Sequence, residues 1–322
     1  MKRLKVVYLK EGGADALWEE VITSKIRDHH DLCVYNIQES ADVSFEEFDA
    51  VIDMGGTSPT QELVDTLKNA KLWQIVSVGY DLLDMEMLRR AGIPVCHCPG
   101  RTSSVGLAEV AVLFILMIVH RYNEAQEVLA RGELYHPMGS EVEGRVLGLI
   151  GFGASGQELA RLAKPLGVRY MIIEPQEIDR SLLAEYEPEF VGKPDEMNHV
   201  FSEADLISLH LPLFPETRGI VDAAKIGLMK PTAWFINMAR GDLVDQEALY
   251  EALLNNRIGG IGTDVHVGRY PTPDHPVYQH PNFYAMPHVS GTTSGTVRYR
   301  AEVCLENLNM LAQGMKLKYR VD

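Results

Sequence analysis

The first hundred residues alternate short runs rich in β-branched and aromatic residues with segments whose apolar positions recur at helical spacing. Strand and helix patterns follow one another over Leu4–Leu9, Ala14–Ile26, Phe48–Asp53, Gln61–Asn69, Leu72–Val78 and Met85–Arg90. Such alternation predicts a parallel sheet with helices on both faces. Two loops, 53–59 and 77–81, follow strands of this pattern, where a doubly wound sheet places ligand-binding residues. We expect both loops to line a cleft.

A second alternation follows, with strands expected over Val146–Ile150, Arg169–Ile173, Leu206–Leu209, Ala233–Asn237 and Gly260–Asp264. Between the two alternations the pattern is helical from Ser104 to Gly132, which predicts one long helix leading from the first unit into the second. The last amphipathic segment, Thr292 to Gln313, is expected to form a helix that packs back on the first unit.

At 322 residues, with 46% hydrophobic and 23% charged side chains, the chain has the composition of a folded protein of about two domains. The sequence therefore predicts the α/β class, with two Rossmann-like or flavodoxin-like doubly wound parallel-sheet domains and an interdomain cleft. We expect a discontinuous first domain over residues 1–100 and 290–322, and a second domain over residues 101–289.

The charge and the cysteine content limit which binding partners and which cellular compartment are expected. The formal net charge of −15 repels nucleic acid and anionic lipid surfaces, so neither is an expected partner. Four scattered cysteines indicate neither a disulfide framework nor a zinc module, which favours a reducing compartment, and we expect a cytoplasmic protein. The apolar run near the N-terminus stops at Lys10, too short for a signal peptide. The segment Val110–Val119 has about half of the roughly 20 residues that span a bilayer.

The stretch Ser104–Val119 is apolar on nearly every side of a helix. One stripe is interpreted as core: Val105, Ala108, Val112, Ile115, Leu116 and Val119. Four further apolar residues lie outside that stripe: Val110, Leu113, Phe114 and Met117. Because such a helix must be covered all round, a second copy of the chain is the expected cover, and a homodimer is predicted.

The apolar strand over Val146–Ile150 runs directly into Gly151-Phe152-Gly153-Ala154-Ser155-Gly156, after which helical phase resumes. This G-x-G-x-x-G spacing between a strand and a helix is typical of dinucleotide binding. Gly151 permits the turn, Gly153 admits the pyrophosphate and Gly156 permits close helix packing. Glu174 ends the next strand, 18 residues after Gly156, where a carboxylate binds the adenosine ribose and repels a 2′-phosphate. The expected cofactor is NAD rather than NADP, although Arg180 follows closely enough to pair with a phosphate.

Six motifs, in order, resemble those of the D-isomer-specific 2-hydroxyacid dehydrogenase family over nearly the whole chain. They are Ser77–Asp81, the glycine fingerprint, His210–Leu213, Asn237–Gly241, Gly262–Val265 and Pro287–Gly291. The resemblance implies hydride transfer between NAD(H) and a 2-oxo or 2-hydroxy acid, in a homodimer joined through the cofactor domain. It also implies that backbone N–H groups of Val78 and Gly79 bind the substrate carboxylate. Beyond the three glycines, the expected cofactor-binding residues are Phe152, Ala154, Ser155, Glu174, His210, Pro212, Thr217, Met238, Ala239, Asp264, His288 and Gly291.

Two residues in these motifs carry the chemistry that carbonyl reduction needs. Arg240 follows a strand, and a guanidinium there binds a carboxylate and polarises the adjacent carbonyl. His288 matches the family's acid/base histidine, which gives a proton to the substrate oxygen in reduction and removes it in oxidation. Asp264 matches the residue that binds the nicotinamide carboxamide, and an aspartate there equally caps the turn after its strand. The predicted function is an NAD-dependent oxidoreductase that interconverts a 2-oxo acid and a D-2-hydroxy acid.

The sequence departs from the family at the residue that usually holds the catalytic histidine. Arg269 stands where most of the family has a glutamate, and no carboxylate lies between Asp264 and Asp274. A cation beside His288 disfavours a protonated imidazole, the reverse of what a proton donor needs. Three interpretations follow: Arg269 points away, it binds a second anionic group on the substrate, or the protein binds NAD without turnover. We favour the second and count Arg269 among the catalytic candidates.

Other classes stay open. The family's formate-oxidising branch has an amide at the glutamate position and needs no proton transfer, and its turn resembles Pro287–Thr293. Against that branch, serine replaces the expected asparagine in Thr102-Ser103-Ser104. A further alternative is a regulatory homologue that binds NAD without catalysis. The sequence shows neither the disordered tail nor the basic surface that would support this alternative. Histidines 266, 275, 280 and 288 have irregular spacings, so no metal is expected.

Overall fold

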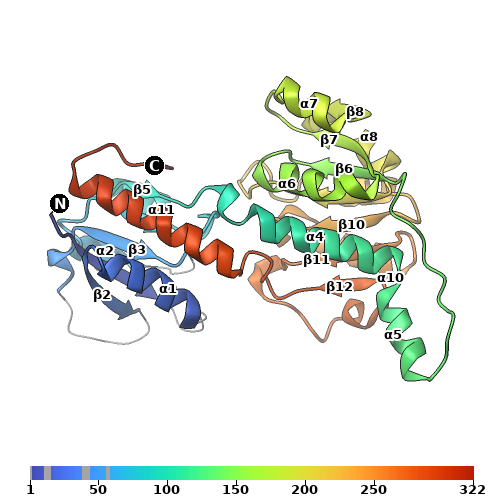
Figure 1. The fold of residues 1–322 in the computed structure, drawn as a ribbon, viewed down its shortest axis with the longest axis horizontal. Coiled ribbons are helices and arrows are strands. Elements are labelled where there is room, and N and C mark those ends of the chain that lie inside the picture. Colours follow the sequence, from blue (N-terminus) through green and yellow to red (C-terminus); the bar gives the residue numbers. More distant parts are fainter. Residues whose placement is uncertain (1, 11–15, 38–43, 56–58) are drawn as a thin grey trace. The chain divides into compact units, whose positions relative to one another are not determined.

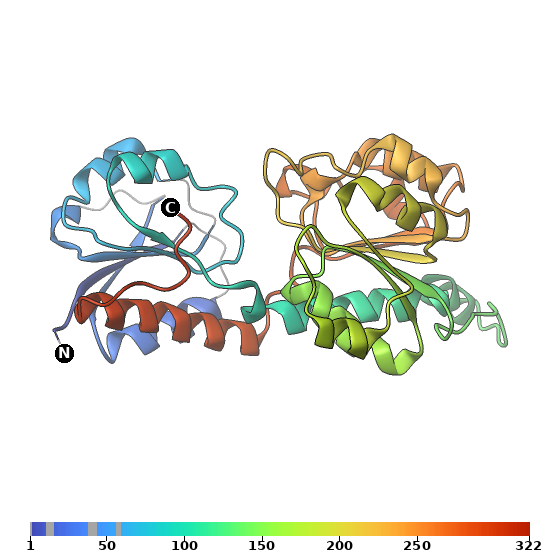
Figure 2. The same cartoon turned by 90° about the horizontal axis from the view of Figure 1, so that it is seen from above.

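The structure is a computed structural model that describes residues 2–10, 16–37, 44–55 and 59–322, without the side chains of Leu17 and Arg269. The chain divides into two compact units (Figure 1). Unit 1 consists of Met1–Ser103 with Thr293–Asp322, and unit 2 of Ser104–Thr292. Each unit contains one parallel sheet with helices on both faces (Figure 2). The predicted α/β class with two parallel-sheet domains is therefore confirmed.

Unit 1 is built on a five-stranded sheet in the order β2-β1-β3-β4-β5. The strands are β1 (Lys5–Lys10), β2 (Asp31–Asn36), β3 (Ala50–Asp53), β4 (Trp73–Ile75) and β5 (Val95–Cys96). The helices are α1 (Ala16–Arg27), α2 (Gln61–Thr66), α3 (Met85–Arg90) and α11 (Ser294–Ala312). One hydrophobic core lies between the sheet and the pair α1 and α11, and another lies under α2 and α3. Because both faces are covered, β3 is buried at every position.

Unit 2 contains a seven-stranded sheet in the order β12-β11-β10-β9-β6-β7-β8. The strands are β6 (Val146–Ile150), β7 (Arg169–Ile173), β8 (Phe190–Gly192), β9 (Leu206–Leu209), β10 (Trp234–Asn237), β11 (Gly260–Thr263) and β12 (Phe283–Ala285). The helices are α4 (Ser104–Val119), α5 (Tyr122–Ala130), α6 (Ala154–Ala163), α7 (Arg180–Tyr186), α8 (Met197–Glu203), α9 (Ala223–Leu228) and α10 (Gln246–Leu254). The core residues of α4, α6 and α7 cluster on one face of the sheet, and those of α8, α9 and α10 on the other.

The strand order of unit 2 fixes where a ligand can bind. From β6 the chain proceeds outward through β7 and β8, and then returns to β9 on the other side of β6. All neighbouring strands are parallel, so their carboxyl ends meet at one edge of the sheet. The order reverses between β6 and β9, and open α/β sheets bind ligands beside such a reversal.

The prediction of one long helix from Ser104 to Gly132 is wrong. The helix breaks between α4 and α5, whose axes differ by 56°. Arg121 takes a left-handed backbone conformation with φ of 51°, which ends the helical hydrogen bonding. The freed carbonyl of Val119 instead accepts the N–H of Ser140 at 2.8 Å. In the described part of the chain, no single helix is long and apolar enough to cross a membrane. The bent pair α4 and α5 together has the length and composition of a membrane span, and this is the only basis for considering it as one.

The face assignment within α4 also needs correction. Val105, expected in the core stripe, is 47% exposed, whereas Phe114, expected outside that stripe, is 1% exposed. Phe114 packs where Gly262 leaves space, since a β-carbon on that glycine would lie 3.1 Å from the phenyl ring. Because Gly262 has no side chain, the large ring of Phe114 from α4 can pack against it. The helical periodicity of α4 alone does not reveal this contact.

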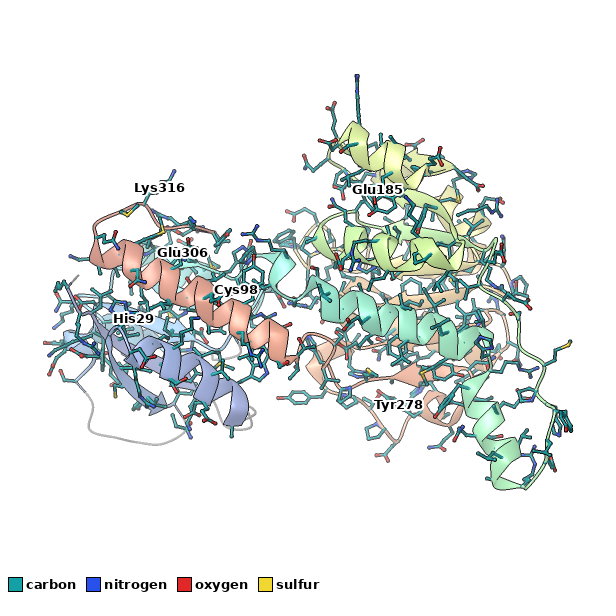
Figure 3. All side chains as sticks on the ribbon, in the orientation of Figure 1. His29, Cys98, Glu185, Tyr278, Glu306 and Lys316 are labelled. Carbon is teal, nitrogen blue, oxygen red and sulfur yellow. The ribbon has the colours of Figure 1, made fainter. Side chains whose placement is uncertain are left out.

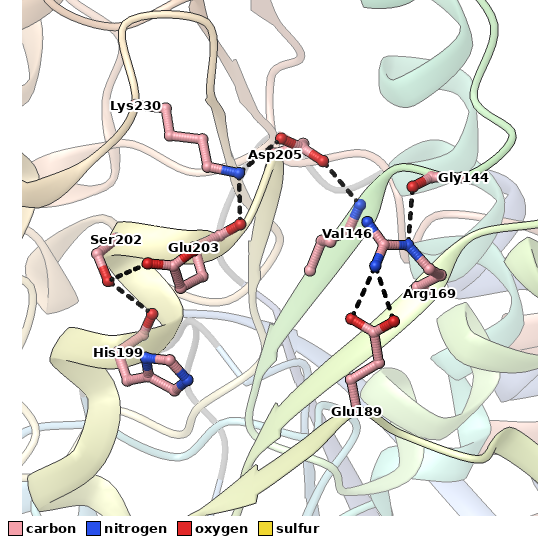
Figure 4. Close-up of polar contacts among 9 residues, drawn as sticks. All are labelled: Gly144, Val146, Arg169, Glu189, His199, Ser202, Glu203, Asp205 and Lys230. Atoms are coloured by element: carbon pink, nitrogen blue, oxygen red, sulfur yellow. Dashed lines mark hydrogen bonds and ion pairs between the residues drawn. The ribbon is translucent and has the colours of Figure 1, made fainter.

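Charged side chains close the amino edge of the unit 2 sheet (Figure 4). The Asp205 carboxylate accepts the N–H of Val146 and the ammonium of Lys230, each at 2.9 Å. Arg169 donates two hydrogen bonds to Glu189, at 2.8 and 3.0 Å. Burial acts to raise the pKa of Asp205, but its hydrogen bonds with Val146 and Lys230 hold the pKa below its usual value. The charges at this edge therefore satisfy one another.

Candidate active site

The glycine fingerprint forms the turn between β6 and α6. Gly151 has a φ of 96°, and a β-carbon on it would lie 2.8 Å from the carbonyl oxygen of His210. A β-carbon on Gly156 would lie 2.3 Å from the carbonyl oxygen of Gly151. At Gly153, by contrast, an added β-carbon meets nothing within 4 Å. Two of these glycines are thus required by packing, and the third leaves an open surface at the start of α6.

The first turn of α6 presents backbone donors beside that open surface. Gly153 is the N-cap and contributes no side-chain hydrogen bond, and among the residues that the structure describes no side chain accepts the N–H groups of Ala154 and Ser155 at the start of the helix. Backbone donors at a helix N-terminus favour a phosphate oxygen. Phe152 is 2% exposed and packs edge-on against Tyr186, so its side chain belongs to the core and only its backbone faces the loop.

Glu174 lies at the carboxyl end of β7, beside the same loop. Its carboxylate accepts the N–H of Phe152 at 2.7 Å and the N–H of Gln176 at 3.1 Å. Each carboxylate oxygen retains a further lone pair, which can accept a ribose hydroxyl. The glycine turn that an added β-carbon would fill, the uncapped start of α6 and this carboxylate together fit an adenine dinucleotide such as NAD.

His210 connects the end of β9 with the glycine turn. Its ring nitrogens lie 2.8 Å from the hydroxyl of Ser208 and 3.1 Å from that of Ser155. Burial lowers the pKa of His210 to about 4, so the ring is neutral at pH 7. In the loop that follows, Thr217 donates to the carbonyl oxygen of Pro212 at 2.8 Å and closes the turn.

The turn that carries Arg240 follows β10 and is shaped by Asn237. The Asn237 amide oxygen accepts the N–H of Ala239 at 3.0 Å, and its amide nitrogen donates to the carbonyl oxygen of Arg240 at 2.9 Å. Met238 and Ala239 are buried, while Arg240 is partly exposed. The buried amide therefore fixes the backbone from which the guanidinium projects.

Gly241 brings this turn against the loop after β11. A β-carbon on Gly241 would lie 2.3 Å from the carbonyl carbon of His266 and 2.4 Å from the backbone nitrogen of Val267. Backbone atoms cannot move aside as a side chain can, so only glycine permits this approach. The Arg240 turn and the His266 loop thus form one rigid contact.

The loop that carries His288 follows β12, and Asp264 holds it from the end of β11. The Asp264 carboxylate accepts the N–H of Val289 at 2.9 Å and the N–H of Ser290 at 3.0 Å, and it also accepts the Ser290 hydroxyl. Asp264 is 1% exposed. Gly291 lies in a turn closed by a hydrogen bond from Thr292 to Val289. Asp264 thus anchors the histidine loop, and its expected contact with nicotinamide stays a prediction.

The carboxyl edge of unit 2 therefore gathers most of the candidates that the sequence indicated. Gly151, Glu174 and His210 follow β6, β7 and β9, while Arg240, Asp264 and His288 follow the adjacent strands β10, β11 and β12. Asn237, Gly241 and Ser290 support the site without having been predicted to do so, and His266 was considered only as a metal ligand. An asparagine and a glycine at the two ends of the motif that contains Arg240 were the available signal.

Some candidates lie elsewhere or outside the described residues. Val78 and Gly79 belong to unit 1, where the Val78 carbonyl oxygen lies 2.8 Å from Nδ1 of His97. Of the hydrogen bonds among described residues, none uses the N–H of either residue. Only the backbone of Arg269 is described, at the end of a short 3₁₀ turn, and residues 56–58 of the first candidate loop are outside the described part.

Within the described ranges, no group of three or more histidine, cysteine, aspartate or glutamate side chains is placed to hold a metal ion. The histidines considered as ligands have local partners instead. Nδ1 of His275 accepts the N–H of Val277 at 3.2 Å, and Nδ1 of His280 accepts the N–H of Asn282 at 3.1 Å.

Comparison with known proteins identifies the relatives of this chain. Residues 112–290 match the family model of the D-isomer specific 2-hydroxyacid dehydrogenase NAD-binding domain. A glyoxylate reductase of Korarchaeum cryptofilum is 30% identical over 90% of this chain and 89% of its own length. A D-3-phosphoglycerate dehydrogenase of Methanocaldococcus jannaschii is 31% identical over 84% of this chain, which spans only 51% of that relative. The crystal structure of the TT0316 protein from Thermus thermophilus has a TM-score of 0.80 and 27% identity, covering 98% of this chain and all of that one.

The match confirms both the predicted family and its NAD-binding domain, and the matched range includes the glycine turn, Arg240, Asp264 and His288. We conclude that the chain belongs to the D-isomer specific 2-hydroxyacid dehydrogenase family.

Proposed function

We propose that this protein uses NADH to reduce a small 2-oxo acid to the D-2-hydroxy acid, and that it catalyses the reverse oxidation with NAD. The observation that carries the proposal is the convergence of the Arg240 and His288 loops at the carboxyl ends of β10 and β12, on either side of β11. Gly241 and Asp264 hold these two loops against the loop after β11. A relative named glyoxylate reductase supports the substrate class.

The proposed roles follow from the side chains. When bound, NADH would supply the hydride that the carbonyl carbon receives. The Arg240 guanidinium binds the substrate carboxylate, polarises the carbonyl and stabilises the negative charge that develops on its oxygen. The His288 imidazole delivers a proton to that oxygen in reduction and takes it back in oxidation. In unit 1, the N–H groups of Val78 and Gly79 are proposed as further donors to a substrate carboxylate.

The test is NADH consumption on a panel of 2-oxo acids, from glyoxylate and hydroxypyruvate to dicarboxylic and phosphorylated acids, between about pH 5 and 9. Turnover that Arg240→Gln and His288→Gln each reduce by about 10³-fold supports the proposal. Faster turnover of acids with a second anionic group supports the proposed role of Arg269. The absence of turnover on any acid, with NADH still bound, would overturn the proposed reaction and favour formate oxidation or a binding role.

We further propose that the partner is a second copy of this chain, docked through the segment from α5 to residue 138. Five large apolar side chains there are exposed: Tyr122 at 47%, Leu129 at 63%, Leu134 at 67%, Tyr135 at 101% and Met138 at 87%. Apolar side chains gathered at this density on a surface indicate a protein interface. The cofactor-domain homodimer implied by the family resemblance would cover them.

A further inference from the structure

His266 occupies a buried position between the two loops of the candidate active site. It follows β11 by three residues and is 6% exposed. Its Nε2 lies 3.0 Å from the carbonyl oxygen of Met286, and its Nδ1 lies 3.2 Å from the hydroxyl of Tyr278. Tyr278, labelled in Figure 3, precedes β12, and its ring stacks on the imidazole at an interplanar angle of 25°.

These contacts assign the proton positions on the His266 ring. A carbonyl oxygen only accepts hydrogen bonds, so Nε2 carries a proton and donates it to Met286. In the neutral ring Nδ1 then accepts, and the Tyr278 hydroxyl is its donor. The Tyr278 oxygen in turn accepts the N–H of Thr272 at 3.3 Å. A directed series of hydrogen bonds therefore ends on Met286, two residues before His288.

Both flanks of His288 are held by the same short segment of chain. Before the histidine, the Met286 N–H donates to the carbonyl oxygen of Thr263 at 2.8 Å, and its carbonyl oxygen accepts from His266. After it, Val289 and Ser290 bind Asp264. His288 itself has a φ of 59°, which a non-glycine residue keeps only where its surroundings fix it.

We propose that His266, oriented by Tyr278, is a positioning residue that fixes His288 for proton transfer in this chain. The inference rests on the proposed function and assigns part of its site. No carboxylate lies between Asp264 and Asp274 in the sequence, so the usual way of holding the histidine is missing from this segment. His266 acts through the Met286 backbone instead, and its own backbone lies against Gly241, which ties the Arg240 turn to the same residue.

The kinetic test compares His266→Phe, which keeps a ring but removes both nitrogens, with His266→Gln, which keeps an N–H donor. The Phe variant is expected to lose about 30- to 100-fold in kcat, with the KM for NADH within about 2-fold, because a displaced acid slows chemistry rather than cofactor binding. The Gln variant is expected to recover to within about 5-fold of wild type. A recovery of this kind would not follow from a merely structural role.

Tyr278→Phe removes only the hydroxyl that orients His266. It is expected to lower kcat by about 5- to 10-fold in the wild-type background and by less than about 2-fold in the His266→Phe background. Tyr284→Phe is the matched control, since its hydroxyl donates to the Met117 carbonyl oxygen at 3.3 Å and touches neither residue. Equal losses in both backgrounds, or a kcat of His266→Phe within about 2-fold of wild type, would overturn the inference.

A second readout separates this inference from the proposed reaction. The imidazole ¹H–¹⁵N signals of His288, observed with NADH bound in histidine-labelled protein, report its position without turnover. His266→Phe is expected to shift or broaden these signals, and His266→Gln to restore them. If the wild-type protein shows no turnover but the two variants still change the His288 signals in this way, the proposed reaction is refuted and the positioning role is supported. Unchanged His288 signals in an active wild-type background would sink the positioning role alone.

Discussion

The carboxylate of Asp264 accepts both the backbone N–H and the side-chain hydroxyl of Ser290. The end of β11 is therefore hydrogen-bonded to the chain two residues after His288. Asp264 also accepts the N–H of Val289. A buried carboxylate with three donors is a strong anchor, because charge-assisted hydrogen bonds are stronger than neutral ones. The loop that carries the proposed acid/base group is therefore fixed by the sheet rather than by its own sequence.

Asp264→Asn should lower kcat by about 10²-fold while changing the dissociation constant for NADH by less than about 3-fold. The asparagine amide cannot accept from both N–H groups and the hydroxyl, so the His288 loop shifts. Stopped-flow turnover and fluorescence titration of NADH measure the two quantities, and the exposed Asp195→Asn serves as control. A tenfold loss of NADH affinity at unchanged kcat would instead favour the contact with nicotinamide that the sequence suggested.

Gly241→Ala should lower kcat/KM by at least about 10²-fold and the melting temperature by several degrees. The added methyl group would overlap backbone atoms of His266 and Val267, and the Arg240 turn must move away. Gly227→Ala is the matched control: its β-carbon would meet only the guanidinium of Arg257, at 3.8 Å, and alanine favours the helix α9. Loss of activity in both variants would show that the effect is not specific to this contact.

How much of the fold could be predicted depended on burial. Strands covered on both faces, such as β3 and β6, consist mostly of apolar residues and were predicted within a few residues. Edge strands were not predicted: β2 is only partly buried and mixes polar with apolar residues, while β8 and β12 are short. The break after α4 depends on Ser140, a tertiary partner that no local pattern reveals.

The candidate site divides in the same way. Glycine spacing and strand ends indicated the cofactor turn and Glu174, because each is a local consequence of a strand that meets a helix. His266 gave no such signal, since its partner Met286 is distant in sequence and offers only a carbonyl oxygen. The close approach at Gly241 likewise joins two segments that only the sheet brings together.

Glu174→Gln should shift the preference for NADH over NADPH by at least about tenfold towards NADPH. The substitution removes the charge that repels a 2′-phosphate. Nearby, the ammonium of Lys193 lies 3.1 to 3.2 Å from the carbonyl oxygens of residues 174–176 and leaves positive charge at this end of the site. The ratio of kcat/KM for the two cofactors measures the shift. Glu177→Gln changes the same charge in the same loop, so an equal shift there would refute a specific role for Glu174.

Leu134→Ser combined with Met138→Ser should convert a dimer of this chain into a monomer, as measured by light scattering on the eluting protein. The two apolar side chains are 67% and 87% exposed, and burying each in an interface contributes about 1.5 to 3 kcal/mol. Leu228→Ser, at another exposed position, is the matched control and should leave the mass unchanged. A wild-type chain that already elutes as a monomer would contradict the proposed interface.

Acidification should destabilise unit 2 through His210. Its pKa is lowered by burial to about 4, whereas the unfolded chain binds a proton near pH 6.5, so between these values the unfolded state holds more protons. The free energy of unfolding therefore falls as pH falls through this window, by up to about 3 kcal/mol, and the contribution is fully present above pH 6.5. Urea unfolding at steps from pH 7 to 4.5 measures it.

His210→Asn removes the titrating group, so its unfolding free energy should fall less steeply with pH than that of wild type. The variant His199→Asn, at an exposed position (Figure 4), is the control for loss of a histidine. Affinity for NADH should follow the same direction, because a proton on His210 disturbs its contact with Ser155 in the cofactor turn. If the unfolding free energies of wild type and His210→Asn fall equally steeply with pH, burial does not hold the His210 ring neutral. The cofactor turn would then be stable without this ring.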